Sequence, residues 1–167
     1  MNEELAAYIT RLCELSGHTT RIDDDLTLIE PGEDFIYDAF TMRKNYYVYG
    51  HYNRYAFSGT RFGSEFFEIF KKFAIMHFAA DIRTAHDLSP ITFPVISFPH
   101  PNYSIENVSG GTHKLIDTRT AVPTTFTTIT PDALVSLSYL MGTSSEDLLS
   151  LVLEPSGAGY AALYQHD

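Results

Sequence analysis

Residues 64–83 read SEFFEIFKKFAIMHFAADIR, and this stretch decides the fold. Its apolar residues recur at intervals of three and four, the spacing that gathers side chains on one face of an α-helix. Ser64 is a favourable N-cap, and acidic residues follow it in the first turn, where they suit the helix dipole. We therefore predict a long helix over residues 64–83. Its wide apolar face carries five phenylalanine rings, those of Phe66, Phe67, Phe70, Phe73 and Phe78.

So wide an apolar face needs a broad cover, and a β-sheet is the simplest one. The segment before the helix supplies candidate strands, which are separated by turns rich in Asp, Asn, Gly and Pro. We expect these strands at residues 18–22, 26–30, 35–41, 46–52 and 55–58. The charged residues of the helix should mark its solvent-exposed side: Glu65, Glu68, Lys71, Lys72 and Asp81.

The segment that follows the helix is rich in proline, with Pro90, Pro94, Pro99 and Pro101 close together. Proline has no N–H to donate to a neighbouring strand, so residues 91–98 are at most a peripheral strand. Two further strands are expected at residues 103–108 and 112–117, on either side of a hairpin turn at 109–111. Residues 122–128 are another candidate strand because threonine favours extended backbone.

Both ends of the chain are predicted to be helical. Apolar residues line one face of a helix over residues 3–16. Near the C-terminus, Thr130 is a natural N-cap for a helix over residues 131–141 that begins with proline. A second short helix should end at Pro155, followed by a flexible tail from about residue 156.

These elements predict one α+β domain over residues 1–167. A mainly antiparallel sheet is packed by one long aromatic-rich helix, and the N- and C-terminal helices flank it. The apolar fraction of 44% is that of an ordinary globular protein. Cys13 is the single cysteine, so no internal disulfide can form, which fits a reducing compartment. With no basic, apolar leader and no stretch long enough to span a membrane, a cytoplasmic location is expected.

The charge of the chain bears on its partners. Its formal net charge is −10, which argues against nucleic acid and anionic membranes as partners. Ten acidic and two basic residues fall within residues 1–38. An acidic first quarter suits a basic protein partner, although a surface that only keeps the protein soluble would have the same composition.

No local motif indicates an enzyme. His77 and Asp81 lie four residues apart on the predicted helix and could share a metal, but no third ligand or HExxH motif accompanies them. The run from Asp23 to Asp25 lacks the alternating oxygen ligands of a calcium loop, which favours a solvated turn. We therefore expect a non-enzymatic protein with no catalytic residue, no cofactor and no metal.

Aromatic residues are dense between residues 35 and 57. In strands that alternate faces, one set of these side chains enters the core and the other points outward. Outward tyrosines are typical of protein interfaces because they offer large contact area at low entropic cost. The alternative is that the N-terminal helix covers this face of the sheet.

The order of these features resembles the bacterial immunity-protein family typified by the immunity factor of the tuberculosis necrotizing toxin. The resemblance spans residues 5–157. Its features are the SGH end of the first helix, the GEDFIY and NYYVY strand segments, the aromatic helix over residues 66–83, the proline-containing segment 88–95 and the DALVSLSYLM segment from residue 132.

This resemblance implies an antitoxin: a cytoplasmic protein that binds a cognate secreted toxin domain and occludes its active site. For the type member of the family the toxin hydrolyses NAD, which implies an NAD-degrading toxin as the partner here. Charge and aromaticity then suggest which residues contact the toxin. They are Asp23, Asp24, Asp25, Glu33, Asp34, Tyr46, Tyr52 and Tyr55.

Two other functions stay open at this level. A small enzyme or a ligand- or metal-binding domain would bring His77 or His51 together with carboxylates in a concave site. An adaptor module would instead oligomerise through its aromatic sheet.

Overall fold

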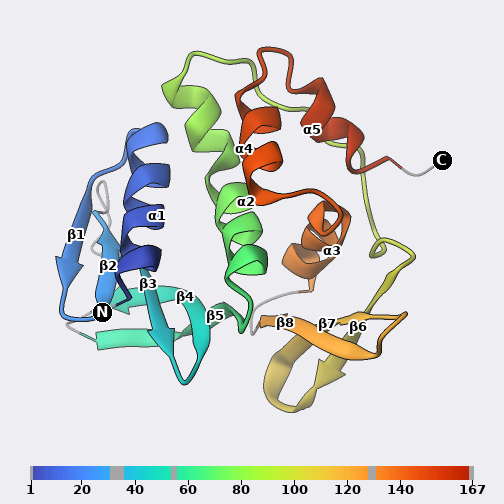
Figure 1. The fold of residues 1–167 in the computed structure, drawn as a ribbon, viewed down its shortest axis with the longest axis horizontal. Coiled ribbons are helices and arrows are strands. Elements are labelled where there is room, and N and C mark those ends of the chain that lie inside the picture. Colours follow the sequence, from blue (N-terminus) through green and yellow to red (C-terminus); the bar gives the residue numbers. More distant parts are fainter. Residues whose placement is uncertain (1, 31–35, 54–55, 128–130, 166–167) are drawn as a thin grey trace.

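The computed structural model describes residues 2–30, 36–53, 56–127 and 131–165. Figure 1 shows two layers, with the helices lying together on one side of a sheet. Within the described residues the sheet has eight strands in the order β1-β2-β3-β4-β5-β8-β7-β6. Every neighbouring pair is antiparallel. The α+β class and the mainly antiparallel sheet predicted from the sequence are confirmed.

The sheet consists of a five-stranded and a three-stranded part. The first part is the meander β1 (Thr20–Asp23), β2 (Leu26–Ile29), β3 (Tyr37–Arg43), β4 (Tyr46–Asn53) and β5 (Ala56–Ser64). The second part is β6 (Tyr103–Val108), β7 (Thr112–Asp117) and β8 (Val122–Thr127), with a short 3-10 turn at Ser109–Gly111 in its first hairpin. Among the described residues, the two parts meet at two residue pairs between β5 and β8.

The helices are α1 (Glu3–Leu15), α2 (Phe67–Ala85), α3 (Asp132–Leu140), α4 (Ser145–Leu153) and α5 (Ala158–Ala162). α1 packs on β1, β2 and β3, α2 on β4 and β5, and α3 on the strands of the second part. α4 packs against α2 on the side away from the sheet (Figure 1). The long aromatic helix and the flanking terminal helices therefore match the sequence prediction. No helix of the described residues has the length and apolarity that crossing a bilayer requires.

The start of the aromatic helix differs from the prediction. Ser64 is the last residue of β5, paired with Tyr47, and α2 begins at Phe67. The Ser64 hydroxyl accepts a hydrogen bond from the Phe66 amide at 3.1 Å, so it closes the strand-to-helix turn and does not cap the helix. β5 is correspondingly longer than the predicted strand at residues 55–58 because its pairing with β4 continues to its last residue.

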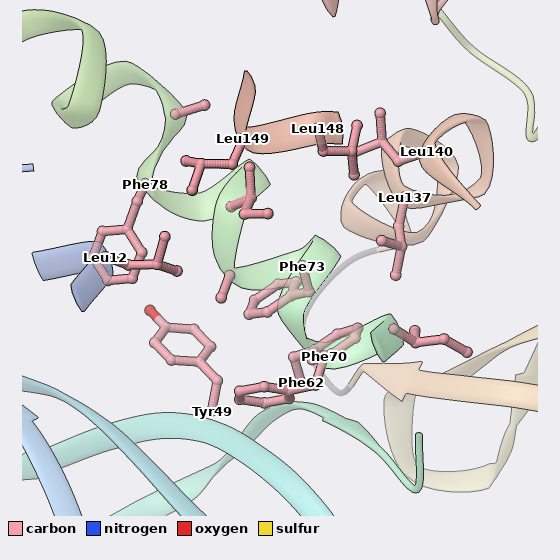
Figure 2. Packing of buried hydrophobic residues seen from close by; sticks show 14 of the residues in the cluster. Leu12, Tyr49, Phe62, Phe70, Phe73, Phe78, Leu137, Leu140, Leu148 and Leu149 are labelled. Carbon is pink, nitrogen blue, oxygen red and sulfur yellow. The ribbon is translucent and has the colours of Figure 1, made fainter. Parts of the chain in front are cut away.

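The core lies between α2 and the sheet. Phe73 of α2 stacks on Phe62 of β5, with ring centroids 3.8 Å apart and planes 5° from parallel. Phe70 meets Phe40 of β3 edge to face, with centroids 6.2 Å apart. Figure 2 shows Phe70 and Phe73 of α2 facing Phe62 of the sheet, and leucines of α3 and α4 on the other side of α2. α2 is therefore covered on both sides, which explains why so many of its residues are apolar.

The charged residues of α2 are only partly on its solvent side: the expected exposure was wrong for Lys72, whereas the Glu68 side chain is half-exposed and also contacts α4. Lys72 is 6% exposed and donates to the Met141 carbonyl at the C-terminus of α3, at 2.8 Å. The Glu68 carboxylate accepts from the amide and the hydroxyl of Ser145, the first residue of α4, at 2.7 and 3.0 Å. A cation at a helix C-terminus and an anion at a helix N-terminus both stabilise the helix dipole. Lys72 and Glu68 therefore fix the end of α3 and the start of α4 against α2.

Arg83 completes this arrangement at the other end of α4. Its side chain is 1% exposed. The guanidinium donates four hydrogen bonds to backbone carbonyls: from Nε to Ser89 at 2.6 Å, from Nη1 to Val152 and Glu154 at 2.7 Å each, and from Nη2 to Pro155 at 3.0 Å. Three of these carbonyls lie at or just after the C-terminal end of α4, where a helix has unpaired acceptors.

The chain after α4 is ordered around Arg83. Gly157 has a φ of +63°, and a Cβ placed there would lie 2.6 Å from Ile91 and 3.2 Å from the guanidinium carbon of Arg83, so only glycine fits. α5 follows, and Tyr160 and Tyr164 are buried at 0% and 5% exposure. This differs from the flexible tail expected from about residue 156. Residues 91–98 form no strand.

Cys13 lies on the buried side of α1 and is 0% exposed. Burial, together with the negative charges of Asp38 and Glu14, raises the pKa of its thiol to about 12. Because the thiolate is the reactive form, we expect Cys13 to react with a thiol reagent at pH 8 only when the chain unfolds. Absorbance of the released chromophore measures this: slow reaction in buffer and rapid, complete reaction in denaturant. Rapid reaction of the folded protein would show that the site opens.

Candidate functional site

The five-stranded part of the sheet has one face that no helix of the described residues covers, which we call the open face (Figure 1). Strand alternation and register decide which side chains lie there. Phe40 and Tyr49 point toward α2. Their immediate neighbours along β3 and β4 therefore point the other way, toward the face without a helix. The open face comprises Arg21, Asp23, Leu26, Leu28, Tyr37, Ala39, Thr41, Arg43, Tyr46, Val48, Gly50, Tyr52 and Phe57.

Aromatic side chains form a thin layer over this face. Leu26, Leu28 and Ala39 are buried beneath Tyr37, Tyr52 and Phe57, which are themselves half-buried. Tyr37 and Tyr52 are cross-strand partners whose rings meet edge to face at 6.2 Å. A Cβ at Gly50 would lie 2.5 Å from the Phe57 ring and 2.3 Å from the Gly59 carbonyl oxygen. Glycine at this position leaves the space that the Phe57 ring occupies beside β4.

Two arginines lie on this aromatic layer. The guanidinium carbon of Arg21 is 5.1 Å from the centroid of the Tyr37 ring, and that of Arg43 is 4.5 Å from the centroid of Phe57. Both distances are those of a cation–π contact. Both arginines remain exposed. The open face thus presents arginine and tyrosine groups that are held in place by contacts beneath them.

The acidic turn predicted at residues 23–25 borders the open face. It joins β1 to β2, and Asp24 has a φ of 53° in the left-handed region, which aspartate tolerates. The Asp25 carbonyl and carboxylate accept from the Thr41 hydroxyl at 2.9 and 3.3 Å, which ties the turn to β3. The Asp23 carboxylate lies 3.8 Å from the Arg21 guanidinium. Asp24 and Asp25 are exposed.

The predicted contact residues fall into two groups. Tyr46 and Tyr52 both lie on the open face, at the two ends of β4, with the acidic turn at its border. A hydrogen bond with Glu65, partial burial and the Glu65 charge raise the pKa of Tyr46. Glu33, Asp34 and Tyr55 lie outside the described residues. The alternative cover for this face, the N-terminal helix, is excluded because α1 packs on the other side of the sheet, beside α2.

A second cluster lies on the helix side of the sheet, where His51 and His77 meet a carboxylate as the ligand-site alternative expected; that this carboxylate belongs to Asp38 was not predicted. The Asp38 carboxylate accepts from the Tyr49 hydroxyl at 2.8 Å, and its oxygens lie 3.3 and 3.5 Å from Nε2 of His77 and His51. Beside it, the ring of His18 pairs with Asp81 at 3.1 Å. Together they line a cleft of about 650 Å³. The available signal was the register, because Asp38 and His51 are cross-strand partners.

His77 and Asp81, which the sequence suggested as possible ligands of one metal, instead have different partners. His77 pairs with Asp38 and Asp81 pairs with His18, so the two residues do not share a ligand. In the described part of the chain, no three His, Cys, Asp or Glu side chains are arranged to hold a metal ion.

The electrostatics of Asp38 give a pH-dependent prediction. Burial opposes its ionisation, but the hydrogen bonds and charges of His77, Tyr49 and His51 outweigh burial and lower the pKa of the carboxyl. A lowered folded-state pKa stabilises the fold above the unfolded pKa of about 3.9 and loses that contribution as pH falls through the folded value. We expect Asp38→Asn to cost about 1–3 kcal/mol at pH 7, because hydrogen bonds to a charged group are lost.

Denaturant unfolding of both proteins between pH 7 and pH 3 measures this effect. The difference between wild type and Asp38→Asn should shrink below about pH 4, because the carboxyl becomes neutral first in the unfolded chain and then, at lower pH, in the folded protein. Asp81→Asn breaks the exposed pair with His18 and is the control, with an expected change below about 1 kcal/mol. A difference between wild type and Asp38→Asn that stays constant down to pH 3 would contradict the assignment.

Known proteins match this chain in family and in fold. The family model described as Immunity protein 61 matches residues 12–160. Among solved structures, Rv3902c from M. tuberculosis aligns with a TM-score of 0.73 at 21% sequence identity, over 94% of this chain and 91% of that chain. A search of curated proteins gives no match. The family model covers most of the sequence, so the resemblance to an immunity-protein family is confirmed, and the chain belongs to the family described as Immunity protein 61.

Proposed function

We propose that this protein neutralises a cognate toxin by binding it through the open face and the acidic turn at residues 23–25, which occludes the toxin active site. Membership of an immunity-protein family supports the antitoxin role. The observation that carries the choice of surface is the layer of exposed arginines and half-buried tyrosines on a sheet face that no helix of the described residues covers. The proposal treats the chain as a non-enzymatic, cytoplasmic inhibitor that forms one immunity-protein-like domain.

The chemistry of the open face suits a protein partner. Tyrosine and arginine are enriched in protein interfaces and among the residues that contribute most to binding. Here the rings of Tyr37, Tyr52 and Phe57 are fixed by mutual packing, and Arg43 is already seated on Phe57. Binding would immobilise few additional side chains, so little conformational entropy is lost.

Charge supports an electropositive toxin cleft as the target. The chain carries a formal charge of −10, and Asp24 and Asp25 are exposed at the border of the open face. A cleft that receives an anionic dinucleotide such as NAD is expected to be basic, so opposite charges would steer the two proteins together. The family resemblance of the sequence favours an NAD-degrading toxin. Protection of the producing cell needs a Kd of about 1 nM, or about 12 kcal/mol, from an interface of roughly 1,600 Å².

The test is co-expression with the toxin encoded beside this protein, followed by titration of toxin activity with purified inhibitor. Wild type should protect cells and inhibit at a one-to-one ratio. Asp24→Lys should raise the Kd about tenfold or more, because it reverses a charge at the proposed interface. Glu146→Lys makes the same charge change at an exposed position of α4 and should leave the Kd nearly unchanged.

Each outcome bears on a separate part of the proposal. Cells that die equally fast with and without this protein would overturn the antitoxin role. Protection that Glu146→Lys weakens and Asp24→Lys leaves intact would keep that role and move the interface to the helical layer.

The cluster around Asp38 favours a second candidate function, a small-ligand site or an enzyme. His51 and His77 converge on one carboxylate in a cleft, as a histidine-containing pocket requires. This candidate predicts that Asp38→Asn abolishes an activity or a ligand-dependent rise in melting temperature. The antitoxin proposal predicts instead that Asp38→Asn still inhibits the toxin at temperatures where it is folded.

A further inference from the structure

A cavity of about 450 Å³ lies within the helical layer, away from the open face. It is bounded by α2, the proline-rich segment before β6, α3 and α5. Its volume is within the range of about 300–1,000 Å³ that is typical of small-molecule sites. The wall is mostly apolar and includes Met76, Ala79, Leu88, Ile91, Phe93 and Tyr160.

The cavity reaches the surface at Phe93. This side chain is 48% exposed, yet it also lines the cavity. Its ring meets Tyr160 and Tyr164 edge to face, with centroids 5.8 and 5.2 Å apart. Ala80 of α2 is exposed and also contributes to the wall. The cavity therefore has an entrance lined by aromatic rings and an apolar interior.

One group in this wall is charged. Arg83 lines the cavity and is 1% exposed. Four of the five N–H bonds of a guanidinium are used here for backbone carbonyls. The second N–H of Nη2 has no acceptor among the described residues, and no carboxylate of those residues forms an ion pair with Arg83.

A buried cation without an anion is costly, and a ligand that supplies the anion removes that cost. One remaining N–H suits a single carboxylate better than a polyanion. The apolar wall suits a hydrocarbon or aromatic body and disfavours a sugar or a nucleotide.

We propose that this cavity binds a small monocarboxylate with an apolar body. The carboxylate accepts the free N–H of Arg83, and the body lies against Met76, Ile91 and Tyr160. Binding links α2 to the proline-rich segment and α5, so an occupied cavity stabilises the C-terminal part of the helical layer.

Three probes that share one chain length test the proposal: octanoate, octan-1-ol and octylamine, each titrated into the intact protein with amide chemical shifts as the readout. Octanoate should saturate at millimolar concentration or below and shift amides around Arg83 and Phe93. Octan-1-ol should bind at least about tenfold more weakly because it lacks the charge-assisted hydrogen bond. Octylamine should not bind, since it would place a second cation beside Arg83.

Two variants test whether octanoate binds in this cavity. Neither replaces Arg83, because its loss would destabilise the fold. Ala80→Phe fills the wall from an exposed helix position and should abolish octanoate binding. Ala162→Phe, at an exposed position of α5 outside the cavity wall, should bind octanoate as wild type does. Equal binding of octanoate and octan-1-ol, no binding of octanoate, or unchanged binding to Ala80→Phe would each overturn the proposal.

Discussion

Replacement of Arg83 by methionine is expected to lower the free energy of unfolding by about 3–5 kcal/mol, a large part of the total stability of a domain this size. Methionine fills much of the same volume but leaves four backbone carbonyls, one buried and three part-buried, without their donor. It also removes the cation at the C-terminal end of α4. The segment before β6 and the segment after α4 then lose the group that joins them.

Denaturant unfolding followed by circular dichroism measures this loss. Arg83→Lys keeps the charge but has only three donors and no planar fork, so it should recover only part of the stability. Arg11→Met, at an exposed position of α1, is the control and should change the free energy by less than about 0.5 kcal/mol. A stable Arg83→Met protein would mean that water replaces the guanidinium at all four carbonyls.

Replacement of Phe73 by alanine is expected to destabilise the protein by about 3–5 kcal/mol, the usual cost of removing a buried phenylalanine. The ring is 5% exposed and stacks on Phe62 between α2 and the sheet (Figure 2). It also contacts Tyr49, with centroids 5.5 Å apart. The surrounding side chains come from two layers, so they cannot easily collapse into the space left behind.

The melting temperatures of Phe73→Ala and Phe98→Ala show whether the loss of stability comes from removing a buried ring or from removing any phenylalanine. Phe98 is 77% exposed on the proline-rich segment, so its replacement should have little effect. Similar losses for both variants would contradict the assignment of the core to the space between α2 and the sheet.

Much of the fold could be predicted because its signals are local. Residues 64–83 carry the periodicity of a helix, and turns rich in Gly, Asn and Asp separate the strands. The end of β5 was missed because Ser64 suits both a helix N-cap and a strand end, and only its pairing with Tyr47 decides between them. The C-terminal helix α5 was missed because Tyr160 and Tyr164 become buried only against distant residues such as Phe93.

The roles of charged residues were harder to predict for the same reason. Glu68 and Lys72 have the spacing of a solvent-exposed face, but the ends of α3 and α4 lie against them. Asp38 gives no signal within its own strand, since its partners come from β4 and α2. The outward position of Tyr46 and Tyr52 followed from alternation, whereas the arginines seated on the aromatic rings depend on strand register.

The narrow junction between β5 and β8 has a consequence for how the protein moves. Seven residue pairs join β3 to β4, whereas among the described residues two pairs join the five-stranded part of the sheet to the three-stranded part. The described part of this seam has fewer backbone pairs than the β3–β4 ladder, so we expect a sub-global opening of the native state to begin there. Amide protons along the seam would then exchange with solvent sooner than those of β3 and β4. A partner bound only to β1–β5 would stay bound while the sheet opens between β5 and β8.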